Sequence, residues 1–332
     1  MEGFYVEKYT DEMEEKWDKF VEKNAFNGTF LQSRNFLNYH PRGRFQDASI
    51  IIYYKNTSEI MAVVPAAQVY ESGKKIFYSH PGSTFGGIVF NKQFYNLKCV
   101  EIALDRLEEF CKSEGYNEII LKQSGQIFSI KNNDLLEYFL FNKRYRHNSE
   151  ISFVIDFQNY EEDILSNFTS SRRRGYKYGA KSGLNFKELF TREEIVEFYE
   201  LLCENLQKFG AKPVHSKEEL LDFKFSRLRD NVRFFGTYLE ERIVAGAMVF
   251  LFGDRVFHTQ YLAASQKDLN LFPNNYNDAH LIMVAKEERY PYFSFGISTE
   301  EQGKVLNKSL AEFKEGFGTE YRNNKIWYKD LE

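Results

Sequence analysis

The sequence has few cysteines and no apolar run long enough to cross a membrane. Its three cysteines, Cys99, Cys111 and Cys203, are odd in number, far apart and without a CxxC pair, which argues against both a disulfide framework and a zinc site. The apolar run 243–252 suits a buried strand and is well short of the roughly 18 residues that a membrane span needs. The first residues also lack the basic start and apolar core of a signal peptide. We therefore expect buried thiols in a cytoplasmic protein without an integral membrane segment.

A large positive charge and the common catalytic motifs are absent too. The formal net charge of −4 argues against a protein coated in basic residues for indiscriminate nucleic-acid binding, so DNA is not an expected partner. The chain has no HExxH, GxSxG, Walker lysine loop or GxGxxG, and its six histidines do not cluster at ligand spacing. These absences argue against a serine hydrolase or a metal site, and no metal cofactor is expected.

The length and composition are those of an ordinary globular protein. A chain of 332 residues is long for one core and favours about two domains. Hydrophobic residues make up 43% and charged residues 28%, and we interpret the 33 Phe and 22 Tyr as core-filling side chains.

The pattern of residues predicts the same order of elements twice. In the first half we expect a helix over 11–23, a hairpin of strands 48–54 and 60–69, short strands interrupted by glycines 82, 86 and 87, a helix over 97–114 and a strand over 118–122. In the second half we expect a hairpin of strands 232–238 and 243–252, a strand over 255–261, a helix from 273 to 289 and a strand over 292–295.

The two hairpins also resemble each other in sequence. The phrases at 53–62 and 237–245 share a Tyr, a turn, an Ile and an Ala in the same order, as an internal duplication would. We therefore predict an α/β (α+β) fold of two similar lobes, residues 1–155 and 156–332, each with a mixed central sheet flanked by helices.

A basic segment follows the predicted boundary. Residues 161–182 read as one long helix, with acids in the first turn and a closing glycine at 183. Its second half is basic: Arg173, Lys177 and Lys181 are four apart and form a stripe, and Gly175, Gly179 and Gly183 keep the same spacing. The stripe is either a solvated face or a platform for the phosphates of coenzyme A, a nucleotide-linked sugar or the end of a tRNA. The glycines predict that the helix packs closely against a neighbour.

The C-terminal part carries a family resemblance. Residues 293–299 read Phe-Ser-Phe-Gly-Ile-Ser-Thr, and residues 310–318 read Leu-Ala-Glu-Phe-Lys-Glu-Gly-Phe-Gly. This resembles the closing signature of the FemA/FemB/FemX (FemAB) family of the GNAT acyltransferase superfamily, a strand ending in Phe-Gly followed by Phe-Lys-x-x-Phe-Gly. The basic helix, the Ile-Val-Ala-Gly at 243–246 and the Phe-Leu-Gln-Ser at 30–33 agree with the family's order. The resemblance covers most of the chain and is strongest between residues 165 and 320.

The resemblance implies two GNAT-like lobes, an active site mainly in the second, and transfer of an acyl or aminoacyl group from a thioester or a tRNA ester to an amine. It implies that Phe313 and Lys314 act at the reacting centre. Chemistry gives Lys314 the same role, because an ammonium stabilises the negative charge that grows on a carbonyl oxygen under attack. Phe313 would exclude water or stack on the donor. The competing interpretation is one packed and one solvated residue.

Further site residues follow from their expected places. Tyr261 and His258 lie on the strand expected to face the donor, where either could pass a proton. Their spacing of three places them on opposite faces of a regular strand unless a bulge intervenes. We expect the phosphates of the donor to bind to basic residues of the helix predicted over 161–182 and to the start of the helix predicted over 273–289. This set consists of Arg172, Arg173, Lys177, Lys181 and Asn275.

Two features of the sequence depart from the family's patterns. The pyrophosphate loop of GNAT enzymes is rich in glycine, whereas the corresponding stretch, 266–273, has none, which puts backbone binding of a pyrophosphate there in doubt. Members that modify peptidoglycan peptides with aminoacyl-tRNA can carry a helical arm in the second lobe. Only two ordinary helices, around 193–209 and 217–230, are expected in its place.

These observations predict an N-acyltransferase acting on a cell-envelope precursor. The expected acceptor is an amine of a nucleotide-linked amino sugar or a peptide, as in peptidoglycan precursors. Acetyl-CoA or another acyl-CoA is the first expected donor, and aminoacyl-tRNA is the alternative, with tRNA then a partner. The competing function is a ligand-binding module that has the fold without the chemistry.

Overall fold

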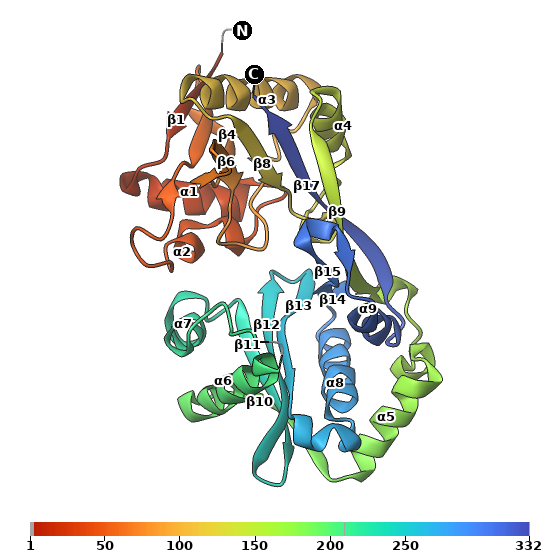
Figure 1. Cartoon of the computed structure of the whole chain (residues 1–332). Coiled ribbons are helices and arrows are strands. Elements are labelled where there is room, and N and C mark those ends of the chain that lie inside the picture. Colours follow the sequence, from red (N-terminus) through yellow and green to blue (C-terminus); the bar gives the residue numbers. More distant parts are fainter. Residues whose placement is uncertain (1–2, 209, 332) are drawn as a thin grey trace. The chain divides into compact units, whose positions relative to one another are not determined.

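A computed structural model describes residues 3–208 and 210–331 (Figure 1). The chain divides into two compact units: the first comprises Met1–Glu150, Glu301–Lys304 and Asn323–Glu332, and the second comprises Ile151–Glu300 and Val305–Arg322. Strands β9 (Arg146–Asp156) and β17 (Glu320–Asp330) contain residues of both. The division therefore differs in its C-terminal part from the one predicted at residues 155 and 156. The reason is that the end of β17 pairs with β8 (Glu118–Lys122) of the first unit.

The described residues of the first unit form two sets of strands and four α-helices. One sheet has the order β1-β3-β4-β7, and a second run of strands has the order β17-β8-β6-β5-β2. The strands are β1 Phe4–Lys8, β2 Gln46–Asp47, β3 Ile50–Tyr54, β4 Glu59–Val64, β5 Ala67–Glu71, β6 Lys74–Ser79 and β7 Val89–Phe90. The helices are α1 Glu14–Lys19, α2 Arg34–Leu37, α3 Leu97–Ser113 and α4 Asp134–Asn142.

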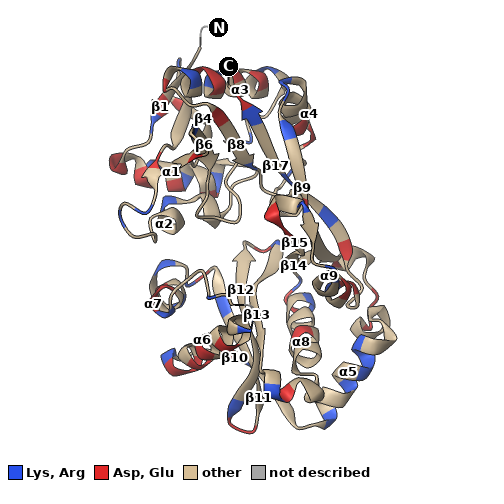
Figure 2. Ribbon diagram, viewed as in Figure 1, with Lys and Arg blue, Asp and Glu red and all other residues tan. Residues whose placement is uncertain are grey.

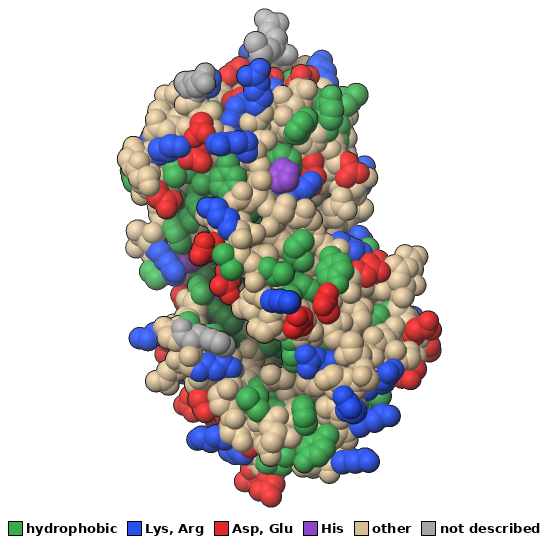
Figure 3. All heavy atoms as spheres, turned by 45° about the vertical axis from the view of Figure 1, so that its right-hand side comes forward, with side chains coloured by type: hydrophobic (Ala, Val, Ile, Leu, Met, Phe, Trp, Pro, Cys, Tyr) green, Lys and Arg blue, Asp and Glu red, His purple; other side chains and the backbone are tan. Residues whose placement is uncertain are grey.

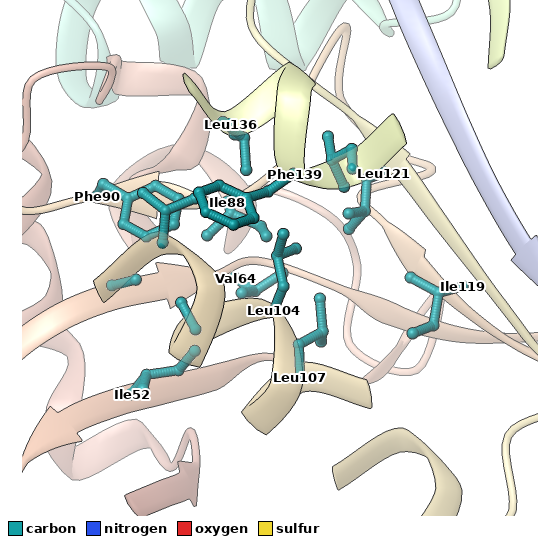
Figure 4. Packing of buried hydrophobic residues seen from close by; sticks show 14 of the residues in the cluster. Ile52, Val64, Ile88, Phe90, Leu104, Leu107, Ile119, Leu121, Leu136 and Phe139 are labelled. Carbon is teal, nitrogen blue, oxygen red and sulfur yellow. The ribbon is translucent and has the colours of Figure 1, made fainter. Parts of the chain in front are cut away.

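The core of the first unit lies between its strands and the helices α3 and α4. Figure 4 shows side chains from β3, β4, β8, α3 and α4 meeting in this cluster. Helix α3 contributes Val100, Leu104 and Leu107, which fall on one face at helical spacing and are fully buried. The helix begins at Asn96, whose side chain accepts from the backbone N–H of Cys99, and ends before Gly115, which has a φ of 73°. The predicted helix and its stop are confirmed.

One predicted strand of the first unit is divided. The apolar run 60–69 forms β4, which pairs with β3, and β5, which pairs with β6 and β2. The break falls at Pro65, which has no N–H to donate to a ladder, so a single strand over 60–69 was wrong. The predicted helix over 11–23 is present as α1 with a 3-10 turn, Asp11–Met13, before it and a π turn, Phe20–Asn24, after it.

The second unit is one mixed sheet with helices on both faces. Its strand order is β10-β11-β12-β13-β14-β9, and only the pair β13 and β14 is parallel. The strands are β10 Leu184–Leu189, β11 Val232–Leu239, β12 Arg242–Phe252, β13 Val256–Ala264 and β14 Tyr292–Ile297, with a small pair of β15 Thr299–Glu300 and β16 Val305–Leu306. The helices are α5 Ser170–Lys181, α6 Arg192–Gln207, α7 Lys217–Asp222, α8 Pro273–Glu287 and α9 Lys308–Glu315.

Alternation along β11 decides which helix covers which face. Phe234 meets Phe198 of α6, whereas the next residue, Phe235, belongs to the cluster that contains α8 and α9. Helices α6 and α8 therefore cover opposite faces of the sheet (Figure 1). Helix α8 is the crossover between the parallel strands β13 and β14, as this pairing requires.

The two hairpins that looked duplicated in the sequence also share an irregularity. In β3–β4 the register shifts between Ile52 and Tyr53, after which Tyr53 pairs with Ile60. In β11–β12 it shifts between Thr237 and Tyr238, after which Tyr238 pairs with Ile243. Each lobe therefore contains the same bulged Tyr–Ile hairpin, as the internal duplication predicted from the sequence implies.

The predicted long helix over 161–182 was wrong in its first half. Residues Ile164–Asn167 form a separate 3-10 turn, and α5 begins at Ser170, with the hydroxyl of Thr169 accepting from the N–H of Arg172. The chain breaks at Phe168 because its ring is buried against Phe317. Helix α5 then ends where predicted, before Gly183 with a φ of 76°.

The expectation that the glycines of α5 mark a close helix contact is confirmed. Both Gly175 and Gly179 are buried on the side of α5 that faces α8. A Cβ at Gly175 would lie 2.1 Å from the side-chain nitrogen of Asn275, and one at Gly179 would lie 3.1 Å from the Cβ of Tyr276. Glycine therefore lets the two helices approach more closely than side chains would allow.

We expect Gly175→Ala to destabilise the second unit. Alanine favours a helix over glycine by about 1 kcal/mol, but the clash with the buried Asn275 should outweigh this gain and cost roughly 1–3 kcal/mol net. Urea unfolding measures the change. Ser171→Ala, at an exposed position of the same helix, is the control and should stay within about 0.5 kcal/mol of wild type. A Gly175→Ala protein as stable as this control would contradict the close contact.

Candidate active site

The candidate site lies in the second unit, where β13 and β14 stop pairing. Their parallel ladder covers only Val256–His258 and Tyr292–Ser294, although β13 continues to Ala264. Just beyond this point Gly296 adopts a φ of 70°, and a Cβ there would lie 3.1 Å from the His258 ring. The Phe-Gly at the end of β14 thus has a physical reason, since the backbone turns here against a side chain of the neighbouring strand.

Lys314 projects from α9 to this end of β14. Its Nζ donates to the carbonyl oxygen of Ile297 at 2.6 Å and to that of Gly296 at 3.3 Å. The side chain is 3% exposed, and burial lowers the pKa of Lys314 to about 7, against an opposing effect of Asp278. Lys314 is therefore a buried residue and not a solvated surface lysine.

Asp278 is a site residue that the sequence analysis missed. It lies on α8, is 2% exposed, and its Oδ1 accepts from the side-chain amide of Asn277 at 3.1 Å. Burial raises the pKa of Asp278 to about 7, while the positive charges of Arg172 and Lys314 lower it. Its signal in the sequence was weak, because α8 carries several other polar residues and the cationic neighbours of Asp278 come from distant segments.

Arg172 joins α5 to α8 and α9. Its guanidinium lies 4.2 Å from the ring centre of Phe313, Nε donates to the Phe313 carbonyl at 3.2 Å, and Nη1 lies 3.5 Å from Oδ1 of Asn275. Gly316 leaves room for this side chain, because a Cβ there would lie 2.7 Å from it. The Phe-Lys-x-x-Phe-Gly segment therefore contacts Arg172 through Phe313 and Gly316, and it contacts the end of β14 through Lys314.

The start of α8 is not built like a glycine-rich anion loop. Residues Gln266–Leu271 form a 3-10 helix (η8), and Phe272, in the left-handed region, precedes Pro273 at the first turn of α8. Asn275 is 4% exposed and already holds Arg172. Tyr176 and Tyr178 of α5 pack on Tyr276 and Phe272. The first turn of α8 is thus covered by α5 on this side, in agreement with the departure noted in the sequence.

A bulge in β13 brings His258 and Tyr261 to the same face. Met248 pairs with Tyr261 and Val249 with Thr259, so Gln260 is an extra residue. Accordingly Phe257 and Leu262 both face the α8 side. His258 contacts the Ser294 hydroxyl at 3.0 Å, and the Tyr261 hydroxyl lies 2.7 Å from Nδ1 of His215. Burial lowers the pKa of His258 to about 3 and raises that of Tyr261 to about 12, so neither titrates near neutral pH.

The remaining predicted residues lie on other sides of α5. Arg173 donates to the carbonyls of Leu165 and Ser166, both at 3.4 Å, whereas Lys177 and Lys181 are exposed. Figure 2 shows the basic residues along α5, which has no acidic residue. The structure thus brings Arg172, Asn275, Phe313 and Lys314 together and separates them from Lys177 and Lys181. The roles of all these residues stay predictions.

Comparisons with known proteins agree with this architecture. Residues 166–314 match the family described as Acetyltransferase (GNAT) domain. The crystal structure of FemX superimposes with a TM-score of 0.69 at 13% identity, over 97% of this chain and 96% of that one. The chain has a FemX-like fold. No curated protein sequence matches it.

Two further structures share this FemX-like fold. One is the C-terminal domain (DUF2156) of a putative lysylphosphatidylglycerol synthetase from Agrobacterium fabrum, with a TM-score of 0.56 at 12% identity over 81% of each chain. The other is a tandem GNAT protein from the clavulanic acid biosynthesis pathway, with a TM-score of 0.52 at 9% identity over 99% and 98%. The predicted FemAB-like architecture of two GNAT lobes is thereby confirmed.

The region between β10 and β11, where a helical arm would be inserted, contains ordinary helices in the described part of the chain. As expected, α6, α7 and a π turn, Phe223–Arg227, are the helices that the described residues form between β10 and β11, without a helical arm. Within residues 3–208 and 210–331, no three His, Cys, Asp or Glu side chains are grouped to hold a metal ion. None of the helices described in these ranges is long and apolar enough to span a membrane.

We expect the burial of Lys314 to show in the pH dependence of stability. Between about pH 7 and the ordinary lysine value of 10.5, the unfolded chain holds a proton that the folded chain has partly lost. Raising the pH through this window deprotonates Lys314 in the unfolded chain as well, so the free-energy cost of burying its charge disappears. The stability of wild type relative to Lys314→Met should therefore increase from about pH 7 towards about pH 10.

Urea unfolding of both proteins across this range provides the measurement. Lys308→Met is the matched control, because Lys308 lies on the same helix with a side chain 82% exposed. Its difference from wild type should not change with pH. Parallel pH curves for wild type and Lys314→Met would show that the Lys314 ammonium is solvated.

Proposed function

We propose that this chain is an N-acyltransferase that transfers an acyl or aminoacyl group to an amine of a cell-envelope precursor, an amino sugar or a peptide. The observation that carries the proposal is the placement of Lys314, a buried ammonium at the point where β13 and β14 part. It lies at the end of the segment that matches the GNAT acetyltransferase domain. The shared fold of FemX and a putative lysylphosphatidylglycerol synthetase supports an acceptor in the cell envelope.

The proposed chemistry places Lys314 at the reacting carbonyl. The amine nitrogen attacks the acyl carbon, the new C–N bond forms, the bond to the thiol sulfur or ribose oxygen breaks, and the proton lost by the amine ends on that leaving sulfur or oxygen. Negative charge on the acyl oxygen is stabilised by the Lys314 N–H that does not point at the carbonyls of Gly296 and Ile297. A buried ammonium is effective here because water does not screen it. His258, with a pKa near 3, is too weak a base to take the proton.

The proposed donor is either an acyl-CoA thioester or an aminoacyl-tRNA ester. The GNAT match favours acyl-CoA in general. Aminoacyl-tRNA is the second candidate, and a specific observation favours it. The first turn of α8, where an anion would meet free backbone N–H groups, lacks glycine and is packed against α5. The donor pyrophosphate of coenzyme A therefore has no ready-made cradle at this helix start.

We expect Lys314→Met to lose turnover while it keeps its fold. Methionine retains much of the aliphatic stem, whereas removal of one such donor typically lowers turnover on the order of 100-fold to 1000-fold, or about 3 to 4 kcal/mol. Turnover is measured as release of free coenzyme A from acetyl-CoA with a panel of amino sugars. In parallel, loss of label from aminoacyl-tRNA is followed with nucleotide-linked peptides as acceptors.

Lys308→Met controls for the loss of a lysine on α9 and should react like wild type. Wild-type turnover in Lys314→Met would remove Lys314 from the mechanism. A loss of donor affinity with normal turnover at saturation would instead assign Lys314 to donor binding. If wild type transfers from neither donor to any acceptor, the ligand-binding module becomes the better description.

A further inference from the structure

The outer side of α5 and the 3-10 helix η8 expose large apolar side chains together. Tyr178 is 51% exposed, Leu269 is 45% exposed and Phe272 is 43% exposed. The Tyr178 and Phe272 rings meet edge to face with centres 5.7 Å apart, and the N–H of Phe272 donates to the Leu269 carbonyl at 3.1 Å. Tyr178 and Phe272 are thus in ring contact and Leu269 lies one turn before Phe272, and we call these three exposed side chains the α5 patch.

Four exposed cations lie on the two helices that carry the α5 patch. Arg174, Lys177 and Lys181 on α5 and Lys267 on η8 are exposed. At helical spacing, Tyr178 lies between Arg174 and Lys181 on one face of α5. The only acid of these two helices, Asp268, is buried and paired with Arg242 at 2.6 Å. Figure 3, which turns this side of the molecule forward, shows hydrophobic side chains between Lys and Arg in its lower part.

Phe272 is exposed and has a strained backbone conformation. Its φ of 55° is in the left-handed region, which a bulky residue rarely adopts and where Asn or Gly is usual. Burial of the ring does not offset this strain, because nearly half of the side chain is exposed. An exposed aromatic ring in a strained conformation, beside an exposed aliphatic side chain and four cations, indicates a surface that meets an apolar and anionic partner.

We propose that the α5 patch docks on an anionic phospholipid surface. Tyr178, Leu269 and Phe272 would enter the boundary between headgroups and acyl chains, and the four cations would lie against lipid phosphates. This role requires neither the proposed reaction nor either donor. It would keep the second unit at the membrane surface.

The composition of the patch favours lipid over RNA. Leu269 has no ring on which a base could stack, and the edge-to-face contact of Tyr178 with Phe272 occupies one ring face of the pair. Three of the four cations are lysines, which act as point charges and lack the planar fork with which arginine grips single phosphates. A lipid surface uses all seven side chains.

Flotation of the full-length protein with vesicles tests the proposal. Wild type should bind vesicles of phosphatidylcholine with phosphatidylglycerol and not vesicles of phosphatidylcholine alone, and salt should weaken the binding. Lys177→Gln with Lys181→Gln should lower the vesicle-bound to free ratio roughly fivefold for each lysine. Phe272→Asn should lower it as well and retain the fold, because asparagine accepts the left-handed conformation.

Matched controls come from the first unit. Lys98→Gln with Lys112→Gln removes the same charge from exposed positions of α3, and Phe141→Ser removes a ring that is 73% exposed on α4. Both should bind vesicles like wild type. The proposal is overturned if wild type ignores phosphatidylglycerol at low salt, or if the controls lose as much binding as the patch variants. It is equally overturned if the patch variants lose binding to mixed tRNA while the vesicles stay unbound.

Discussion

The close contact between α5 and α8 is the constraint on which the candidate site depends. Two missing side chains, at Gly175 and Gly179, let the helices approach, and Arg172 on the same helix then reaches Asn275. The guanidinium of Arg172 also lies on the ring of Phe313 and bonds its carbonyl, which fixes α9. Because α9 is fixed, Lys314 meets the end of β14. The FemAB-like signature on α9 is thus one part of a set of contacts that begins on α5.

Electrostatics adds a second constraint to this geometry. Asp278 interacts electrostatically with both Arg172 and Lys314, and the aspartate and lysine are almost fully buried. Two cations and one carboxyl leave a net positive charge when all three are ionised, and the burial of Asp278 and Lys314 makes this charge costly. Negative charge growing on an acyl oxygen would bring the group to neutrality. In the proposed reaction this cluster would favour an anionic transition state, which is where binding energy increases rate.

Local patterns predicted the elements well because they depend on local causes. The strand 118–122 follows from a short run of β-branched and aliphatic residues, and the helix before it stops at Gly115, which adopts a positive φ. The failures have non-local causes. The helix expected over 161–182 breaks where Phe168 finds Phe317, which is distant in the sequence. Asp278 could not be assigned because its charge matters only once α5 and α9 bring cations to it.

The basic helix α5 illustrates why charge counting and geometry lead to different conclusions. In the sequence its cations form a single group without an acid, which predicts one phosphate platform. In the structure Arg172 and Arg173 turn inward to carbonyl and ring partners, whereas Arg174, Lys177 and Lys181 stay exposed around Tyr178. Arg172 contacts the candidate site, Arg173 contacts the turn before α5, and the outer residues are exposed to solvent. Helical periodicity separates the two sets, so a phosphate bound by one set need not belong to the molecule bound by the other.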